Sequence, residues 1–132
     1  MYSVYGDTVL DPFLGTGTTM MAAAAAGRNC VGIEHDIGFE PVIDEVMRTA
    51  PAYSSERSQD RLRAHIAFVD EYTSQKGELK HTNQCHNYPV VTSQERDLEL
   101  LEANEIAQNA DNQYEAHYKR ADLAGGQQFL DF

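Results

Sequence analysis

Lysine is scarce in this chain of 132 residues, which has 21 acidic residues against 10 lysines and arginines together. The formal net charge is -11, so tight binding to a phosphate backbone by this chain alone is not expected, because such binding depends on Lys and Arg. Little lysine with abundant Asp and Glu is also typical of proteins from salt-loving microbes, where concentrated salt screens repulsion between like charges. The composition therefore predicts a halophilic source, with an ordinary acidic protein as the alternative.

Cysteine and long apolar runs are also rare. The two cysteines, Cys30 and Cys85, are too few for a disulfide framework. No basic segment precedes an apolar core, as it would in a signal peptide. The alanine run at residues 22–26 is far shorter than the roughly 20 apolar residues that a membrane span needs. These absences predict a cytoplasmic protein without a membrane segment.

Apolar residues are concentrated near the N-terminus, where they predict a strand, a helix and a second strand. The strands are expected at Thr8–Asp11 and Asn29–Glu34, and the alanine-rich helix at Thr18–Ala26, with Gly27 ending it. Strands joined through a helix are parallel, with a right-handed crossover. The fold class predicted is therefore α/β.

The rest of the chain is more polar and its pattern is weaker. A helix is predicted at Phe39–Met47, a break at Ala50-Pro51, and a further helix at Ser55–Tyr72. Residues 77–88 have no clear period, Pro89–Thr92 is a short candidate strand, and Ile106–Tyr118 is a candidate hairpin around the turn 109–112. We expect residues 1–76 to form a half-domain and residues 77–132 an appendage of loop plus hairpin.

The glycine-rich turn between the first strand and helix predicts a nucleotide-type site. A Gly-x-Gly turn at Gly15 and Gly17 lets a ligand approach the backbone, and the following helix directs free N–H groups toward it. Glu34, at the end of the second strand, is suitably spaced to accept hydrogen bonds from ribose hydroxyls. Asp11 adds a carboxylate that faces the turn.

Three ligand classes are compatible with this arrangement to different degrees. A phosphate-binding P-loop needs Gly-Lys-Ser/Thr, whereas this chain has Gly17-Thr18-Thr19. A dinucleotide site favours a third glycine where this chain has Met20, and Asp11 would repel a pyrophosphate. The Asp11 carboxylate suits a cationic ligand instead, such as the amino group or sulfonium of S-adenosylmethionine.

The run Asp11-Pro12-Phe13-Leu14-Gly15-Thr16-Gly17-Thr18-Thr19, followed by Gly27-Arg28 and Val31-Gly32-Ile33-Glu34, resembles the cofactor motif of one family of DNA methyltransferases. That family methylates the exocyclic amine of cytosine (N4) or adenine (N6). The resemblance covers residues 6 to about 47. It implies S-adenosylmethionine as cofactor and a partial Rossmann-like fold with parallel strands and flanking helices. The alternative is a Rossmann-like domain for another nucleotide.

The resemblance also implies roles for individual residues. Asp11, Phe13, Gly15 and Gly17 would line the methionine and ribose side of the cofactor, and Glu34 would hold the ribose hydroxyls. Residues just after Glu34, beginning with His35, would approach the adenine. With Thr18, at the start of the helix, the predicted cofactor-binding set is Asp11, Phe13, Gly15, Gly17, Thr18, Glu34 and His35.

The family's catalytic motif, Asp/Asn/Ser-Pro-Pro-aromatic, is not found in this sequence. The nearest run, Asn87-Tyr88-Pro89-Val90, lacks the paired proline. One permuted arrangement of the family has its catalytic half before the cofactor motif, so the chain is expected to be the C-terminal, cofactor-binding part of such an enzyme, of haloarchaeal origin. It would act on DNA through a companion catalytic half. A non-catalytic remnant or regulatory module is the alternative.

Other side chains that could carry chemistry have more ordinary interpretations. His81, Cys85 and His86 are only three ligand-type residues, where a zinc site normally needs four, so a polar loop is favoured over a metal site. Arginines and acids alternate at residues 56–63, which favours a solvated, ion-paired face over DNA contact. The scattered tyrosines of the second half are expected to be packing residues.

Overall fold

The computed structural model describes residues 3–109 and 112–123. Its contacts group the chain into two compact units. The first contains the residues up to Arg57 together with Leu101–Lys119, and the second contains Ser58–Leu100 and the residues from Arg120 onward. Leu101–Lys119 thus groups with the N-terminal elements. No helix among the described residues has the length and apolar character to cross a membrane.

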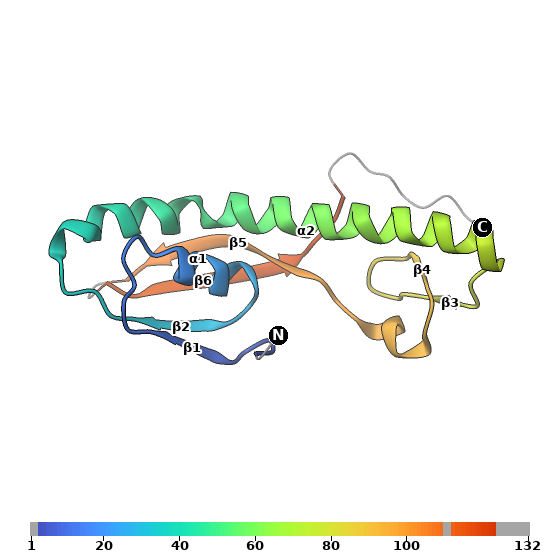
Figure 1. Ribbon diagram of the computed structural model, residues 1–132, viewed down its shortest axis with the longest axis horizontal. Helices are drawn as coiled ribbons and strands as arrows, with labels where there is room; N and C mark the ends of the chain where they lie inside the picture. Colours follow the sequence, from blue (N-terminus) through green and yellow to red (C-terminus); the bar gives the residue numbers. More distant parts are fainter. Residues whose placement is uncertain (1–2, 110–111, 124–132) are drawn as a thin grey trace. The chain divides into compact units, whose positions relative to one another are not determined.

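The first unit begins with the predicted strand, helix and strand. β1 (Thr8–Asp11) and β2 (Asn29–Gly32) are parallel and in register, from Thr8 opposite Asn29 to Asp11 opposite Gly32. The first strand has its predicted bounds, whereas the second ends two residues before Glu34. Figure 1 shows the two strands side by side, with α1 (Thr18–Ala25) connecting them. The predicted parallel pair is therefore confirmed.

α1 is short, and its alanines form part of the core. Ala23 and Ala24 are buried, and the small side chains let the helix lie close to its neighbours. The helix ends at the C-cap Ala26, and Gly27 follows with a left-handed φ of 67°. This is the usual conformation of a residue just past a helix end and favours glycine there. The last helical residue is thus Ala25, one before the predicted Ala26, and Gly27 follows the C-cap instead of forming it.

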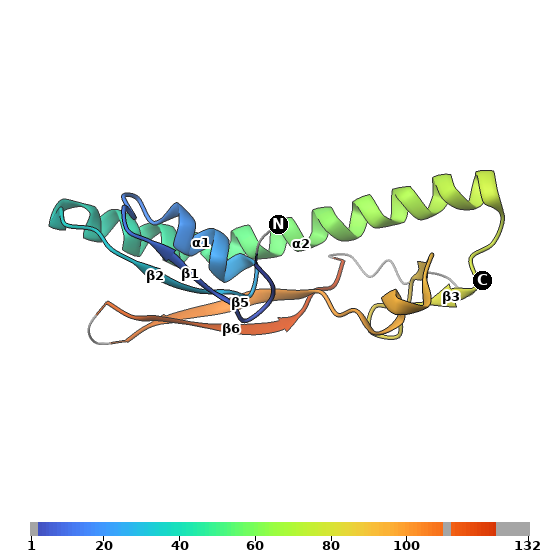
Figure 2. The same cartoon turned by 60° about the horizontal axis from the view of Figure 1, so that its bottom comes forward.

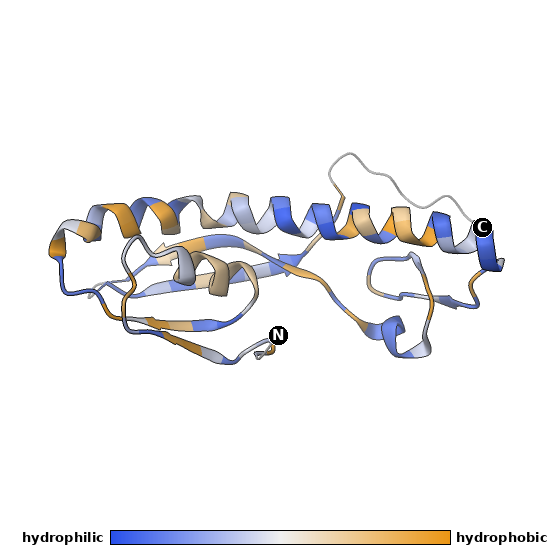
Figure 3. Ribbon diagram, viewed as in Figure 1, coloured by the Kyte–Doolittle hydropathy of each residue, from blue (hydrophilic) through white to orange (hydrophobic). Residues whose placement is uncertain are grey.

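The predicted break at Ala50-Pro51 is wrong. A single helix, α2 (Glu40–Lys76), replaces the two expected helices and contains Pro51, and a 3-10 helix, η1 (Ile37–Phe39), precedes it. Proline inside a helix removes one backbone hydrogen bond and is costly. Here Met47, Ala50 and Ser54 share one buried face of the helix, so packing outweighs the local preference. Figure 3 shows apolar residues alternating with polar ones along α2.

A hairpin of β5 (Leu101–Gln108) and β6 (Tyr114–Arg120) completes the first unit. It contains the predicted hairpin but is longer at both ends, and residues 110–111 of the expected turn lie outside the described residues. The Ala103 N–H donates to Ser54 Oγ at 2.8 Å, and the Tyr118 hydroxyl donates to the Ala24 carbonyl at 2.7 Å. These bonds attach the hairpin to α2 and α1. Figure 1 and Figure 2 both show the hairpin beside these two helices.

The second unit contains little regular structure besides its part of α2. β3 (His81–Thr82) pairs antiparallel with β4 (Pro89–Val90), and η2 (Ser93–Asp97) follows. The expected loop at residues 77–88 thus contains a short strand, and the expected strand at Pro89–Thr92 is two residues shorter. Both differences arise because the pairing spans only two residue pairs. Taken together, the described residues have a mixed α/β structure that includes a parallel pair of strands.

Candidate cofactor site

The glycine turn joins β1 to α1 and is held against the end of β2. The Leu14 N–H donates to the Ile33 carbonyl at 2.9 Å, and the Gly17 N–H donates to the Leu14 carbonyl at 3.1 Å. Gly17 is the N-cap of α1 and has a φ of 82°, a left-handed conformation that a β-carbon disfavours. A β-carbon on Gly17 would also lie 3.4 Å from the Ile43 side chain. The turn therefore requires glycine for its conformation, since the contact with Ile43 alone would leave room for a β-carbon.

The Glu34 carboxylate links the glycine turn to the loop after β2. Its Oε2 accepts from the Gly15 N–H at 2.8 Å, and its Oε1 accepts from the Asp36 N–H at 2.9 Å. His35 Nδ1 lies 3.3 Å from Oε1. The pKa of Glu34 is lowered, first by the Asp36 amide and then by the Gly15 amide, because both hydrogen bonds favour the charged form. Glu34 is thus a fixed anion at the junction of the two segments.

The other predicted site residues lie around the same turn. Asp11 Oδ1 accepts from the Phe13 N–H at 3.0 Å, and the Phe13 side chain is highly exposed, with 87% of its surface accessible. The Thr18 hydroxyl lies 3.1 Å from that of Thr16 at the start of α1. The His35 ring is also exposed. The structure thus brings Asp11, Gly15, Gly17 and Glu34 to one end of the parallel strands.

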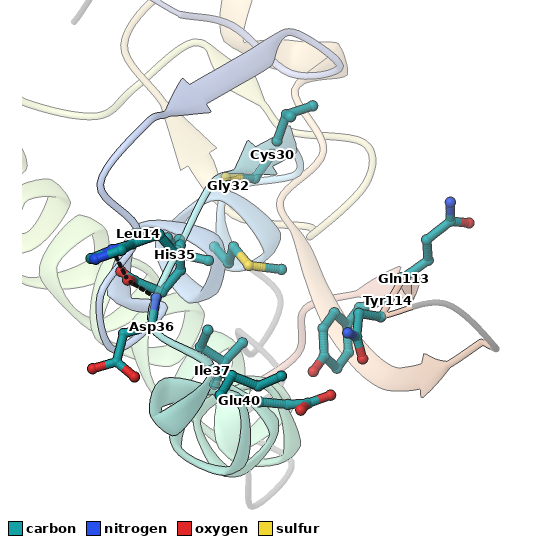
Figure 4. Close-up of a pocket in the computed structure, with 14 residues that line it drawn as sticks. Leu14, Cys30, Gly32, His35, Asp36, Ile37, Glu40, Gln113 and Tyr114 are labelled. Carbon is teal, nitrogen blue, oxygen red and sulfur yellow. Dashed lines mark hydrogen bonds and ion pairs between the residues drawn. The ribbon is translucent and has the colours of Figure 1, made fainter.

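A cavity of about 690 Å³ lies beside this end of the sheet. Of the predicted residues, only Glu34 and His35 line it. The sequence did not single out Asp36, Ile37, Glu40 or the hairpin residues Asn112, Gln113 and Tyr114 as site residues, yet all of them line the cavity. Figure 4 shows Ile37 and Glu40 on one side of this hollow and Tyr114 on the other. The predicted set and the cavity therefore overlap at Glu34 and His35.

Tyr114 reaches the cavity wall from far along the chain. Its hydroxyl donates to Asp44 Oδ1 on α2, and Gln108 Nε2 donates to the same oxygen at 3.1 Å. Burial first, and then the bond to Asp44, raise the pKa of Tyr114 to about 12. No local sequence signal predicts this contact, because the partners are 70 residues apart. The expectation that the tyrosines are packing residues agrees with Tyr118, whose ring packs edge-on against Tyr5.

One face of the parallel pair is uncovered. Val9, Asp11, Cys30 and Gly32 are partly buried on one face, whereas Leu10, Val31 and Ile33 on the other are 62%, 52% and 54% exposed. The pKa of Cys30 is raised, first by burial and then by Asp11. Leu10 and Val31 are paired directly in the register. Parallel sheets are normally covered on both faces, so the exposure of this apolar face is unusual.

The other candidates have ordinary roles in the structure. Arg63 pairs with Asp60 at 3.2 Å, and the Arg57 guanidinium lies over the Tyr53 ring at 5.7 Å. Within residues 3–109 and 112–123, no three His, Cys, Asp or Glu side chains are placed to hold a metal ion. His86 instead accepts a hydrogen bond from the Leu100 N–H through Nε2 at 2.8 Å. Its pKa is lowered, mainly because burial disfavours the charged ring.

Comparison with known proteins connects this chain to DNA methylation. Residues 1–45 match the N6/N4 DNA methylase family. The type II methyltransferase M.MthZI of Methanothermobacter thermautotrophicus is 39% identical over 119 residues, which are 90% of this chain and 32% of that protein. M.MjaI of Methanocaldococcus jannaschii is 58% identical over 45 residues, and M.HinfI of Haemophilus influenzae is 50% identical over 42. No solved structure matches.

These relationships support the resemblance to amino-methylating DNA methyltransferases. The chain spans about a third of the length of M.MthZI and smaller shares of the other relatives, 15% of M.MjaI and 12% of M.HinfI. The similarity to M.MthZI extends far beyond the family motif, because it includes all but a few of the residues of this chain.

Proposed function

We propose that this chain is the S-adenosylmethionine-binding portion of a DNA methyltransferase that modifies the exocyclic amine of cytosine or adenine. The observation that carries the proposal is the position of Glu34, which bonds the Gly15 amide with one carboxylate oxygen and the Asp36 amide with the other. The glycine turn and the loop after β2 thereby form one continuous rim. This rim offers backbone donors, a fixed carboxylate and the start of α1 to a single ligand.

The residues present fit this cofactor. Glu34 Oε2 accepts one amide bond, from Gly15, and retains a second lone pair, so it can still accept from a ribose hydroxyl. Asp11 Oδ1 bonds to the Phe13 amide, which leaves Oδ2 to attract the amino group or sulfonium. Gly15, Gly17 and Thr18 would let the cofactor approach the backbone, and exposed Phe13 and His35 would cover its apolar parts. The bound cofactor would supply an activated methyl group.

The methyl acceptor would come from DNA, with the target base flipped out of the duplex. The catalytic Asp/Asn/Ser-Pro-Pro-aromatic motif is not present in these 132 residues, which contain no adjacent prolines. We propose that the catalytic residues belong to the remainder of the enzyme, on the same or a companion polypeptide. The short span of this chain relative to M.MthZI supports this division of roles.

The uncovered sheet face supports the same division. Leu10, Val31 and Ile33 would be covered by the remainder of the enzyme, which would extend the parallel pair into a Rossmann-like sheet with helices on both faces. On this proposal the N-terminal part of the chain, through residue 76, is a half-domain, and residues 77–132 are an appendage to it. The acidic surface suits a haloarchaeal cytoplasm, where the substrate DNA is also found.

Calorimetric titration of the whole chain with S-adenosylmethionine in molar potassium chloride tests the proposal. The wild-type chain is expected to bind, and Glu34→Ala to weaken binding at least about tenfold, or 1.4 kcal/mol. Glu105→Ala, which removes an exposed carboxylate from β5, is the matched control and should bind as the wild type does. No binding by the folded wild-type chain would contradict the proposal and favour a non-catalytic module. Binding that is insensitive to Glu34→Ala would contradict the assignment of the site.

A further inference from the structure

The second unit contains a polar hollow of about 440 Å³ that is separate from the cofactor site. Its lining includes Lys80 and Arg96, the imidazole of His81, and the side-chain amides of Gln84 and Asn87. Among the described residues that line it there is no Asp or Glu. In a chain with a net charge of -11, a hollow lined by cations and neutral hydrogen-bonding groups is suited to an anion.

The two cations of the hollow lack a carboxylate partner within the described residues. Several other basic side chains are paired with carboxylates, as Arg120 is with Glu99 at 2.8 Å and Lys119 with Glu102 at 3.2 Å. Lys80 and Arg96 are exposed and form no such ion pair in the described part of the chain. Their charge therefore remains available to a ligand.

The hollow is built on a buried asparagine. Asn83 is completely buried, and its Nδ2 donates to the Glu95 carbonyl at 2.7 Å and to the Leu98 carbonyl at 2.8 Å. Its Oδ1 accepts from the Cys85 and His86 amides at 2.9 and 2.7 Å. All of the hydrogen-bonding capacity of the Asn83 amide donors is thus used inside the unit. This network fixes the backbone that carries the lining residues.

Direct backbone contacts bring the two sides of the hollow together. The Gln84 N–H donates to the Arg96 carbonyl at 2.8 Å. Asn87, whose N–H donates to the Asn83 carbonyl at 3.0 Å, has a left-handed φ of 54°, which is uncommon for a residue other than glycine. The lining groups therefore come from a defined turn, so little ordering is needed when a ligand binds.

We propose that this hollow binds a phosphate of the substrate DNA backbone. Arg96 can donate two parallel bonds to phosphate oxygens, and Lys80 supplies a point charge. Gln84 and Asn87 would donate to neighbouring sugar or base atoms. The inference rests on the proposed function, and the similarity to M.MthZI supports it because that similarity reaches into this unit, well past the cofactor motif. The acidic surface makes the contact weak for this chain alone.

Fluorescence anisotropy with a short labelled DNA duplex, at about 50 mM salt, tests the proposal on the whole chain. Replacing both cations (K80Q and R96Q together) should weaken binding at least about tenfold and reduce the slope of log K against log salt by about 1, as expected for one phosphate neutralised. The control replaces Lys76 and Arg61 with Gln, which removes the same charge from exposed positions of α2 in the same unit. Its affinity should change less than about threefold, because it leaves the phosphate contact in place.

Three outcomes would overturn the inference. The first is no binding of the duplex by the wild-type chain, and the second is an equal loss of affinity in both double variants. The third is a shift of the amide signals of residues 83–87 by inorganic phosphate without any binding of the duplex. Titration of the same proteins with S-adenosylmethionine separates this inference from the proposed function. If the cofactor binds but DNA does not, only the assignment of the hollow as a phosphate site is contradicted. If DNA binds but the cofactor does not, only the assignment of the cofactor site is contradicted.

Discussion

The two units of this chain are stabilised in different ways. In the first, secondary-structure elements pack through apolar residues such as Ala24, Met47 and Ala50. In the second, apart from its helix, the backbone is organised by side-chain hydrogen bonds that converge on Asn83. The first unit leaves one apolar sheet face exposed, whereas the turn at Asn83 satisfies its own polar groups.

This difference indicates which region requires more protein. A parallel pair of strands with one bare apolar face gains from being covered, since burial of each large apolar side chain contributes about 1.5–3 kcal/mol. The turn at Asn83 already supplies hydrogen-bond partners to its buried side chain, so a protein cover would add little stability to it. Its exposed polar groups are suited to a hydrated ligand instead. The first unit is thus suited to assembly and the second to polar binding.

The largest effect is expected for Asn83→Ala. The substitution removes four hydrogen bonds and leaves buried backbone groups without partners, at a cost of about 3 kcal/mol. Hydrogen exchange should accelerate for the amides of residues 83–100, and β1 and β2 should be unaffected. Gln84→Ala, which changes the adjacent exposed side chain, is the control. Equal acceleration in β1 would contradict the distinction between the two units.

A smaller effect is expected for Ser54→Ala in the first unit. Ser54 is completely buried, and its hydroxyl accepts the Ala103 N–H of β5. Its loss leaves that amide unpaired and should lower the free energy of unfolding by about 1.5 kcal/mol, as measured in urea. Ser74→Ala removes a hydroxyl that bonds only within α2 and should have little effect. An equal loss for both variants would indicate that the hairpin is not held through Ser54.

Tyr118→Phe tests the contact of β6 with α1. The variant keeps the ring but loses the bond from the hydroxyl to the Ala24 carbonyl, so we expect a loss of about 1 kcal/mol in urea unfolding. Tyr72→Phe is the matched control, because the Tyr72 ring packs against Phe68 and its hydroxyl forms no hydrogen bond among the described residues. If Tyr118→Phe is as stable as this control, the bond to Ala24 does not help to hold β6 to α1.

A further effect concerns alkaline pH. Because the pKa of Tyr114 is raised to about 12 in the folded chain, the folded state retains its proton more strongly than the unfolded state does. This contribution to stability is complete below the ordinary pKa of about 10 and is lost as the pH rises from there toward 12. Tyr114→Phe should therefore show a shallower fall in unfolding free energy over that range. Identical pH profiles for the two proteins would contradict the Tyr114–Asp44 contact.

The N-terminal elements could be predicted from the sequence because their signals are local. Short apolar runs define β1 and β2, and Gly17 and Gly27 define the ends of α1, so each element depends on neighbouring residues. The continuous α2 could not be predicted, because burial of Ala50 and Ser54 by distant segments overcomes the local effect of Pro51.

The candidate site could be predicted from the sequence only in part. Glu34 is identified by its distance from the glycine turn in the sequence, but its hydrogen bond from the Gly15 N–H appears only in the structure. Tyr114 and Gln113 enter the cavity wall only through the folding of the hairpin. Asn83 carries no motif at all, and its importance appears only from its burial and its four hydrogen bonds.

Amide chemical-shift mapping with S-adenosylmethionine on the whole chain shows whether the glycine turn binds the cofactor. Signals are predicted to shift at Gly15, Gly17 and the residues following Glu34, while the amides of residues 83–100 remain unchanged. Such a pattern would assign the cofactor to the first unit and leave the second for other contacts. A saturating titration that shifts no signals in the glycine turn, or that shifts mainly those around Asn83, would contradict the account.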